Sequence, residues 1–554
     1  MIKRNRKLLI VVVVAFIAVF TCNFVRNDFE LAKNLDIYAN LMKQLDENYV
    51  DELNVAEMTK TGIDAMLKQL DPYTVYYPES AIEEFKLMTK GQYGGIGALI
   101  QPDGEYTVIS DPYENCPAFK VGLQPGDKIV EVEGKNVKGK TVSDVSSLLR
   151  GQPGTKIKLG VIPYGKNKIE YKDIVRQEIK LPSVSYFGMW KDNIGYIRLD
   201  QFTENASLEV RNAFAKLKEE GMQSLIFDLR GNGGGLLSEA VNIVGFFVDR
   251  GSLVVTTKGK QADKNQVFLT TNQPIDLKIP IVLLVDGSSA SASEIVSGAL
   301  QDLDRAVIIG ERTYGKGLVQ NIVPLSYNTN LKVTVSKYYL PSGRCIQGVD
   351  YSDKDSVGVS THKSKSDSLA VAFKTKGGRT VFDYGGVEPD VISKIDPYST
   401  ILLAMLERNM IFNYANEYKN AHASISSAKD FAVTDGIYND FLQFVKKGDL
   451  KYETLTERQL KQLKESVKAD KFSENIETVI ASLEKAVAEE KLQDLTRYKK
   501  EISELLTLEI VSRYHFQKGR IEASLNMDLD MKKATELLKD AKMHTAILKG
   551  THKN

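Results

Sequence analysis

Residues 280–303 read PIVLLVDGSSASASEIVSGALQDL, and this stretch decides how the middle of the chain folds. Five consecutive apolar residues, 281–285, predict a buried strand, and the run after the serines predicts a helix. The turn between them lifts a side chain out of the sheet and aims helical N–H groups at whatever binds there. Ser291 in this turn fits a nucleophile. Serines that only cap the helix and pack would give the same pattern.

The same alternation of strand and helix continues on both sides of this stretch. IGYIRL (194–199) and SLIFDLR (224–230) predict strands, while SLEVRNAFAKLKEEG (207–221) and LLSEAVNIVGFFV (236–248) predict helices. Near-continuous apolar strands between helices favour a sheet that is covered on both faces. The fold class predicted for residues 185–350 is therefore mixed α/β.

Glycines cluster where the strand 224–230 ends, in DLRGNGGG (228–235). Such a turn exposes backbone N–H groups, which can hold a phosphate or an oxyanion. The dinucleotide pattern G-x-G-x-x-G fails because Leu236 and Ser238 stand where the last glycine is needed. The phosphate-loop pattern also fails, since no Lys-Ser/Thr pair follows. An oxyanion loop fits better than a nucleotide loop.

A serine nucleophile needs a base. The histidines all follow the last strands of the α/β region, so a Ser-His-Asp triad requires the tail to fold back; they are His362, His422, His515, His544 and His552. A lysine made neutral by desolvation is the other known base. GERTYGKGLVQ (310–320) places Lys316 between two glycines after the apolar run AVIIG (306–310). An exposed turn lysine is the alternative. Glu294 fits the first-turn acid that a helix dipole favours.

The remaining regions differ in character. Residues 27–90 are helical and amphipathic, with Leu31, Leu35, Tyr38, Leu41 and Leu45 on one face, until LDPYTVYYP (70–78) breaks the pattern. Residues 91–180 predict a small module of short strands with one helix, and 181–398 hold the α/β core. The polar segment 351–380 reads as a loop or insertion. Residues 399–554 are helical, highly charged and without a chemical motif.

The length, net charge and cysteine count of the chain argue against several classes of protein. A chain of 554 residues predicts two to four domains, and a net charge of +1 argues against nucleic-acid binding. Three cysteines without CxxC spacing argue against a zinc site or a disulfide scaffold. MIKRNRK followed by the apolar run 8–20 predicts a signal anchor over residues 1–26, although a cleaved signal remains open. With the basic flank in the cytosol, the catalytic part would lie on the periplasmic side of the cytoplasmic membrane.

DLRGNGGG, SASASEI and GERTYGKGLVQ, in this order, resemble the C-terminal processing peptidases, also called tail-specific proteases. YYLPSGRCIQ (338–347) and GGVEPDV (385–391) resemble further blocks of that family. The resemblance implies a crotonase-like α/β core with an inserted PDZ domain, and a Ser-Lys dyad that needs no metal or cofactor. It assigns Ser291 as nucleophile, Lys316 as general base and Gln320 as the residue that orients the lysine. The oxyanion hole would use the N–H groups of Ala292 and Gly234, with Gly235 as an alternative.

GLQPGDKIVEVEGKNV (122–137) resembles a PDZ domain, which this family carries ahead of its protease core. Such domains add a peptide C-terminus as a strand to a sheet edge. The expected peptide-binding residues are Gly94, Gly95, Ile96, Gly97, Ala98 and Leu99. Glycines that serve only tight turns are the alternative. Arg150 matches an arginine that links the PDZ domain to the active site in some relatives.

Together these features predict a membrane-anchored serine endopeptidase that recognises the C-terminal ends of protein substrates. The expected partners are proteins or peptides with accessible C-termini and the inner membrane, and a homo-oligomer or an adaptor remains open. One alternative is a non-enzymatic PDZ scaffold, which predicts the loss of the serine or the lysine. Another is a serine hydrolase of a different acyl class, built on the same core.

Overall fold

The computed structural model describes residues 29–551 except for short segments at 82–86, 88–89, 352–362, 365–369, 384, 395–396 and 472–473. The expected anchor at 1–26 and most of the first half of the polar segment 351–380 lie outside the described residues. No helix in the described part of the chain combines the length and the apolar character needed to cross a membrane.

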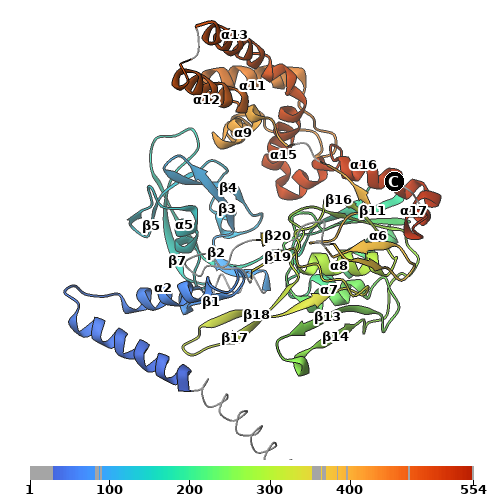
Figure 1. Cartoon of the computed structure of the whole chain (residues 1–554). Helices are drawn as coiled ribbons and strands as arrows, with labels where there is room; N and C mark the ends of the chain where they lie inside the picture. Colours follow the sequence, from blue (N-terminus) through green and yellow to red (C-terminus); the bar gives the residue numbers. More distant parts are fainter. Residues whose placement is uncertain are drawn as a thin grey trace, which may run out of the picture.

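A six-stranded central sheet, of which Figure 1 labels β11 and β16, runs in the order β10-β11-β12-β15-β16-β23. From β11 to β23 neighbouring strands are parallel, and β10 is antiparallel to β11. Loops that follow parallel neighbours leave the same edge of a sheet, so β12, β15 and β16 bring the glycine, serine and lysine motifs together. The strands are β10 (Val184–Met189), β11 (Ile194–Leu199), β12 (Ser224–Asp228), β15 (Ile281–Val285), β16 (Val307–Gly310) and β23 (Val391–Ile392).

Helices cover both faces of this sheet, as the apolar strands predict. Successive strand residues point to opposite faces, so Phe227 and Leu283 pack under one set of helices while Ile226 and Leu284 face another. The first set is α6 (Ala206–Glu219), α7 (Leu237–Val244) and α8 (Ala292–Asp302). The second face is closed by the C-terminal end of the chain, α15 (Lys499–Ser524), α16 (Leu529–Lys539) and α17 (Ala541–Leu548).

A second sheet flanks the core in the order β1-β18-β13-β14, with β17 also paired to β18. Its edge strand β1 comes from LDPYTVYYP, the stretch predicted to break the helical pattern of residues 27–90. The chain is extended here, because β-branched and aromatic residues between two prolines suit a strand. The strands are β1 (Val75–Tyr77), β13 (Leu253–Gly259), β14 (Gln266–Leu269), β17 (Leu318–Pro324) and β18 (Asn330–Tyr339).

Residues 91–180 form a separate module with its own apolar core around Ile129 and Leu159. Its sheet runs β3-β4-β5-β7-β8, β6 pairs with β5, and a second pair joins β2 to β9. The helix α5 (Val142–Leu149) starts at Thr141, whose side chain and Asp144 form a capping box. The other elements are β2 (Gln92–Gly95), β3 (Ala98–Asp103), β4 (Tyr106–Pro112), α4 (Pro117–Lys120), β5 (Lys128–Val132), β6 (Lys135–Asn136), β7 (Lys156–Ile162), β8 (Glu170–Val175) and β9 (Gln177–Lys180).

The helical C-terminal region contacts both the module and the core (Figure 1). Gln517 Nε2 donates to Asp111 Oδ2 of the module at 2.6 Å, and the Tyr164 hydroxyl donates to the carbonyl of Asn413 at 3.0 Å. The helices before α15 are α9 (Thr400–Glu407), α10 (Met410–Ala421), α11 (Asp435–Lys447), α12 (Leu455–Ala469), α13 (Glu474–Lys491) and α14 (Asp494–Arg497).

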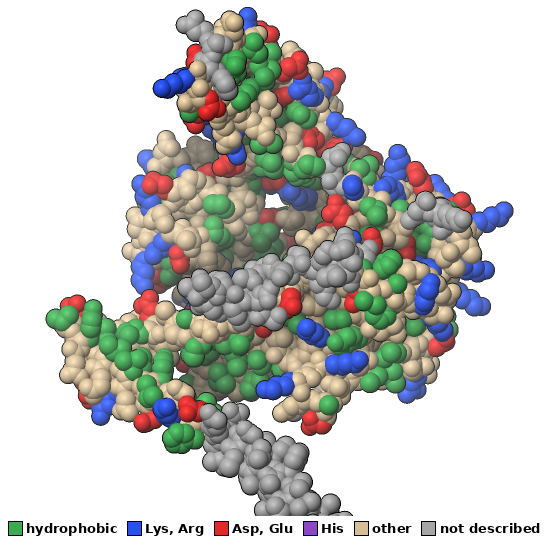
Figure 2. Space-filling view, in the orientation of Figure 1, with side chains coloured by type: hydrophobic (Ala, Val, Ile, Leu, Met, Phe, Trp, Pro, Cys, Tyr) green, Lys and Arg blue, Asp and Glu red, His purple; other side chains and the backbone are tan. Residues whose placement is uncertain are grey.

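The N-terminal arm consists of a helix over residues 29–48 and α2 (Val55–Leu67). Its expected apolar face exists, but Leu31, Leu35 and Leu41 are exposed. Figure 2 shows hydrophobic side chains gathered on this arm, away from the core.

Short elements complete the description. Within 351–380, expected to be a loop, the described residues include β20, β21 and the start of β22. The pairs are β19 (Val349–Asp350) with β20 (Lys363–Ser364) and β21 (Ala372–Lys374) with β22 (Thr380–Phe382); single 3₁₀ turns are η1 (Glu79–Ala81), η2 (Lys191–Asn193) and η3 (Ala262–Lys264).

Candidate active site

Ser291 lies in the turn between β15 and α8, which we call the serine turn (residues 286–291). Its backbone has φ 55° and ψ −111°, a conformation that a non-glycine residue adopts only when its surroundings enforce it. The Ser291 N–H donates to Glu294 Oε2 at 2.8 Å, and the Ala290 N–H donates to the Asn232 carbonyl at 3.0 Å. The strained turn is therefore fixed from two sides.

The lysine loop (residues 311–317) follows β16 and is tied to the serine turn by Glu294. This glutamate is fully buried and accepts hydrogen bonds from the N–H groups of Gly315 at 2.7 Å and Lys316 at 2.9 Å, as well as from Ser291. The Thr313 hydroxyl adds a fourth bond at 2.6 Å. Burial raises the pKa of Glu294, and the hydrogen bonds it accepts oppose that rise. Glu294 therefore joins the lysine loop to the serine turn, in addition to its predicted interaction with the helix dipole.

Tyr338 on β18 provides a second shared anchor. Its buried hydroxyl lies 3.1 Å from the Ser291 carbonyl oxygen and also hydrogen-bonds to the carbonyl of Lys316. The backbones of the predicted nucleophile and the predicted base are therefore held by the same two side chains, Glu294 and Tyr338.

The Lys316 amine is largely withdrawn from solvent. Its Nζ lies 4.2 Å from the centre of the Tyr73 ring, which belongs to LDPYTVYYP. Burial lowers the pKa of Lys316 to about 8, and the charge of Lys332 acts in the same direction, against Glu294 and Asp71. A pKa near the working pH is what a general base needs.

The glycine loop (residues 229–236) lies directly against the serine turn. A Cβ on Gly234 would come within 2.8 Å of Ser291 Cβ and 2.9 Å of the Ala292 nitrogen, and Gly234 has φ 101°. Its N–H, however, donates to Asn232 Oδ1 at 2.9 Å, so in this conformation it is committed elsewhere. Among the contacts of the described residues, the N–H groups of Gly235 and Ala292 have no acceptor. The alternative pair, Ala292 with Gly235, fits this conformation better than Ala292 with Gly234.

One cavity of about 440 Å³ joins these groups. Besides the predicted residues, its wall includes Asp200, Lys332 and Tyr338. The predicted catalytic and oxyanion residues that line it are Ser291, Lys316, Gln320, Gly234 and Ala292.

Gln320 lies in this cavity on β17, but its amide contacts are with other groups. Gln320 Nε2 donates to the Leu318 carbonyl at 3.2 Å and to Thr334 Oγ1 at 3.3 Å. Its predicted role in orienting Lys316 stays a prediction.

The expected peptide-binding residues of the 91–180 module fall into two groups. Gly94 and Gly95 lie in β2 and pair with β9, and a Cβ on Gly94 would meet the Gly151 oxygen at 2.0 Å. Gly94 therefore serves close backbone packing, whereas a Cβ on Gly95 would meet the Tyr93 ring at 2.7 Å. Ile96 and Gly97 connect β2 to β3, and Ala98 and Leu99 begin β3, an edge strand next to α5.

Arg150 remains within this module. It ends α5, and its guanidinium lies 5.4 Å from the centre of the Tyr93 ring. It does not line the catalytic cavity, and its predicted link to the active site stays a prediction.

The histidine alternative finds no support among the described residues. His422, His515 and His544 all lie outside the cavity lining. His544 is buried under the central sheet, where its Nε2 lies 3.3 Å from the Ile281 carbonyl oxygen. His362 and His552 lie outside the described residues.

Comparison with known families agrees with this geometry. Residues 193–354 match the model of peptidase family S41, residues 108–162 match a PDZ domain, and residues 401–538 match the "probable PDZ-protease, C-terminal helical domain". A carboxy-terminal-processing protease of Bartonella bacilliformis is 35% identical over 327 residues, which cover 58% of this chain and 75% of that protein. The chain belongs to peptidase family S41.

The chain is also similar to three other proteins. A probable CtpA-like serine protease of Staphylococcus aureus is 34% identical over 62% of this chain and 68% of its own length. The photosystem II D1 C-terminal processing protease is 28% identical over 64% of this chain and 92% of its own, with a TM-score of 0.35. The PDZ domain of a Vibrio cholerae carboxy-terminal protease, solved in complex with a peptide, is 38% identical over 16% of this chain and 99% of its own, with a TM-score of 0.16.

Membership in S41 makes this chain a serine peptidase with a PDZ domain and a C-terminal helical domain. Sequence reasoning found Ser291 and Lys316 but missed the residues that hold them. Tyr338 begins the block YYLPSGRCIQ and Tyr73 lies in LDPYTVYYP, but neither stretch indicates that its tyrosine contacts the lysine loop. Asn232 is the one polar side chain among the loop glycines, and this position was a usable signal.

Proposed function

We propose that Ser291 and Lys316 form the catalytic dyad of this S41 peptidase and that the chain cleaves proteins it selects by their free C-terminal ends. The observation that carries the dyad is the shared anchoring. Glu294 and Tyr338 each contact the backbones of both residues, and both residues line one cavity.

The chemistry follows from the lowered pKa of the lysine. Neutral Lys316 Nζ accepts the proton of Ser291 Oγ as the oxygen attacks the substrate carbonyl carbon. The developing oxyanion accepts hydrogen bonds from the Ala292 N–H and from a glycine-loop N–H. The C–N bond then breaks, and the Lys316 ammonium returns its proton to the leaving amine. A water molecule, deprotonated by Lys316, hydrolyses the acyl ester. No step needs a metal or a cofactor.

The PDZ domain offers a place for the substrate end. β3 is an edge strand beside α5, and Leu99 on β3 is exposed. A peptide C-terminus can add to such an edge as a further strand. The carboxylate would then lie near Ile96 and Gly97, where β3 begins.

The location of the protein is also part of the proposal. The apolar run 8–20 behind a basic flank supports an anchor in the cytoplasmic membrane, with the peptidase outside the cytosol. Extracytoplasmic proteins would then be the substrates. Labelling of a cysteine introduced into the peptidase by an impermeant reagent in intact cells tests this, and protection from the reagent would contradict it.

Cleavage of an unstructured protein with an apolar C-terminus tests the proposed activity, with fragments identified by mass spectrometry. We expect full-length wild type to cleave it and Ser291→Ala and Lys316→Ala to lose cleavage while remaining folded. Blocking the substrate C-terminus by amidation should reduce cleavage. Activity that survives Lys316→Ala would overturn the dyad. A wild type that binds the peptide without cleaving it would support the scaffold alternative.

A further inference from the structure

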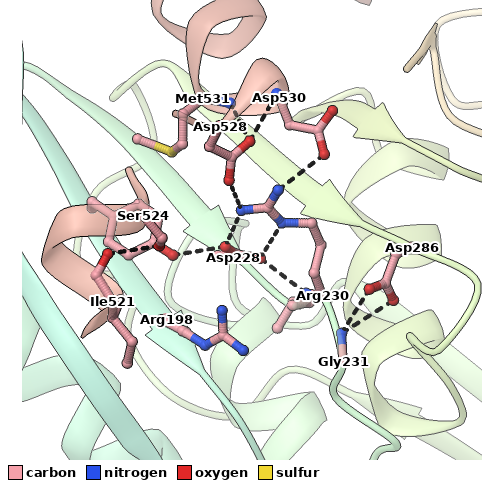
Figure 3. Close-up of polar contacts among 12 residues, drawn as sticks. Arg198, Asp228, Arg230, Gly231, Asp286, Ile521, Ser524, Asp528, Asp530 and Met531 are labelled. Atoms are coloured by element: carbon pink, nitrogen blue, oxygen red, sulfur yellow. Dashed lines mark hydrogen bonds and ion pairs between the residues drawn. The ribbon is translucent and has the colours of Figure 1, made fainter. Parts of the chain in front are cut away.

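Arg230 opens the glycine loop, yet the proposed chemistry does not use it. Its guanidinium is shared by three carboxylates (Figure 3). Asp228, at the end of β12, accepts from Nε at 3.0 Å and from Nη2 at 2.6 Å. The other two belong to the helical domain: Asp528 Oδ2 lies 2.6 Å from Nη2, and Asp530 Oδ2 lies 3.0 Å from Nη1.

This cluster is buried, so its partners depend on one another. The exposed fraction of the side chain is 14% for Arg230, 0% for Asp228 and 2% for Asp530. Burial alone would raise the pKa of Asp228. The pKa nevertheless lies below its ordinary value, because the carboxylate interacts with Arg230, Arg198 and the Tyr196 hydroxyl. A buried ion pair tolerates the loss of a partner poorly, because the remaining charge stays uncompensated.

The helical end of the cluster is rigidly placed. Asp528 is the N-cap of α16: its Oδ1 accepts the N–H groups of Asp530 at 2.8 Å and Met531 at 3.1 Å, which leaves Oδ2 for Arg230. α16 itself packs on the central sheet through Met531, Ala534 and Leu537. The position of these two carboxylates is therefore fixed by the packing of the helical domain.

The other end of the cluster leads into the oxyanion region. The Arg230 N–H donates to Asp228 Oδ1 at 2.9 Å, so the same carboxylate holds the backbone as the chain leaves β12. The next residue, Gly231, has φ 72°, and its N–H lies 3.1 Å from both oxygens of Asp286 in the serine turn (Figure 3).

Asn232 then joins the two loops directly. Its side-chain oxygen accepts the Gly234 N–H at 2.9 Å, and its carbonyl accepts the Ala290 N–H at 3.0 Å and the Ser293 hydroxyl at 2.8 Å. The path from α16 to the oxyanion region thus runs through neighbouring residues of the chain and through hydrogen bonds that are exposed at Gly231 and buried at Asn232.

We infer that Arg230 is a positioning residue through which α16 of the C-terminal helical domain holds the glycine loop in its oxyanion-binding arrangement. The inference rests on the proposed function. It makes the helical domain part of what sets the rate of acylation. Because Lys316 is held by Glu294 and Tyr338, the tie acts on the oxyanion side and leaves the base unchanged.

The test uses the full chain with Asp528→Asn and Asp530→Asn together, which keeps the side-chain shapes and removes both charges. The matched control is Asp192→Asn. Asp192 pairs with Lys539 at the other end of α16 at 2.7 Å, on the exposed surface. Active sites are titrated with a fluorophosphonate probe so that rates refer to folded enzyme.

We expect the double variant to acylate Ser291 about 10- to 100-fold more slowly per titrated site, since displacement of about 1 Å in a catalytic group has that effect. KM should stay within about threefold of wild type and the pH midpoint should not move, because a misplaced oxyanion donor affects the transition state only. Asp192→Asn should acylate at the wild-type rate. If the double variant does not fold, Asp528→Asn alone should show the same pattern with a smaller loss.

Amide exchange gives a readout that does not depend on activity. Residues 229–236 should exchange faster in the double variant, and α8 should be unchanged. The inference would be overturned if the double variant acylated Ser291 at the wild-type rate, or if Asp192→Asn lowered this rate as much as the double variant does. Failure of the proposed function looks different, since it would appear as cleavage by Ser291→Ala.

Discussion

The lysine loop and the glycine loop follow β16 and β12, two parallel strands with β15 between them, and meet at one cavity, but different parts of the chain hold them. The lysine loop is anchored inside the core, by Glu294 on α8 and Tyr338 on β18. The glycine loop is anchored at Arg230 by α16, almost 300 residues further along the chain. The base thus depends on the core and on Tyr73, which precedes β1, whereas the oxyanion side depends on the helical domain as well as on the core.

The largest loss of stability is expected from Glu294→Gln. In the wild type the carboxylate accepts hydrogen bonds from backbone N–H groups on both of its oxygens. The amide has the same shape, but its NH2 group is a donor and would face one set of these N–H donors. We expect kcat per titrated site to fall about 100-fold or more and the free energy of unfolding to fall by about 3 kcal/mol. Stopped-flow acylation and urea unfolding measure the two.

Glu239→Gln is the control for that change. Glu239 is also a first-turn glutamate, on α7, and accepts one backbone N–H, from Ser207 at 2.7 Å. It should leave kcat unchanged. Near-wild-type kcat in Glu294→Gln would show that the lysine loop does not depend on this anchor.

Gly234→Ala tests the contact between the glycine loop and the serine turn. The new Cβ would meet the Ala290 oxygen at 2.7 Å in a backbone with φ 101°. We expect about a 100-fold loss in kcat and about 1–3 kcal/mol of stability. In Gly233→Ala the Cβ meets no atom within 4 Å, so stability should remain near wild type. Equal effects at both positions would contradict the close approach.

Lys316→Met should abolish cleavage yet stabilise the fold near neutral pH. The folded-state pKa of Lys316, about 8, lies below its ordinary value of 10.5, so keeping the amine charged costs free energy. This cost is complete below pH 8 and disappears as the pH rises to about 10.5. Urea unfolding should show a gain of about 1–3 kcal/mol at pH 7 that fades by pH 10. A less stable variant at pH 7 would contradict the buried, desolvated amine.

The smallest effect concerns Lys332, which lines the cavity on β18. Its charge helps to lower the pKa of Lys316, so Lys332→Gln should shift the pH profile of kcat/KM upward by about half a pH unit. Lys337→Gln, on the same strand but exposed, should not shift it. If the pH profile of kcat/KM is the same as in the wild type for both variants, Lys332 does not influence the pKa of Lys316.

The core of the site could be predicted because its signals are local. The turn before Ser291, the glycines of 231–235 and the lysine between two glycines each lie within a few residues of an apolar strand, and parallel neighbours bring such turns together. The apolar strands also predicted that both faces of the sheet are covered.

What closes the second face could not be predicted. Charged helices such as α16 show no motif, and the pairing of Arg230 with Asp528 and Asp530 depends on tertiary packing over a long separation in sequence. The break at LDPYTVYYP was predicted, but the strand β1 within it was not, because its pairing with β18 joins residues far apart in the sequence. The exposed apolar face of residues 29–48 has the periodicity of a packed helix, although the described chain does not bury it.

The pH dependence of Ser291 phosphonylation in the wild type tests the central claim most directly. Single-turnover labelling by a fluorophosphonate between pH 6 and pH 10, in which Ser291 Oγ displaces fluoride from phosphorus, isolates the step in which Lys316 takes the serine proton. The account predicts a rate that rises with pH through a single midpoint near 8, and a loss of that titration in Lys316→Ala. A midpoint near 6.5, typical of histidine, or a titration that survives Lys316→Ala would show that another group is the base.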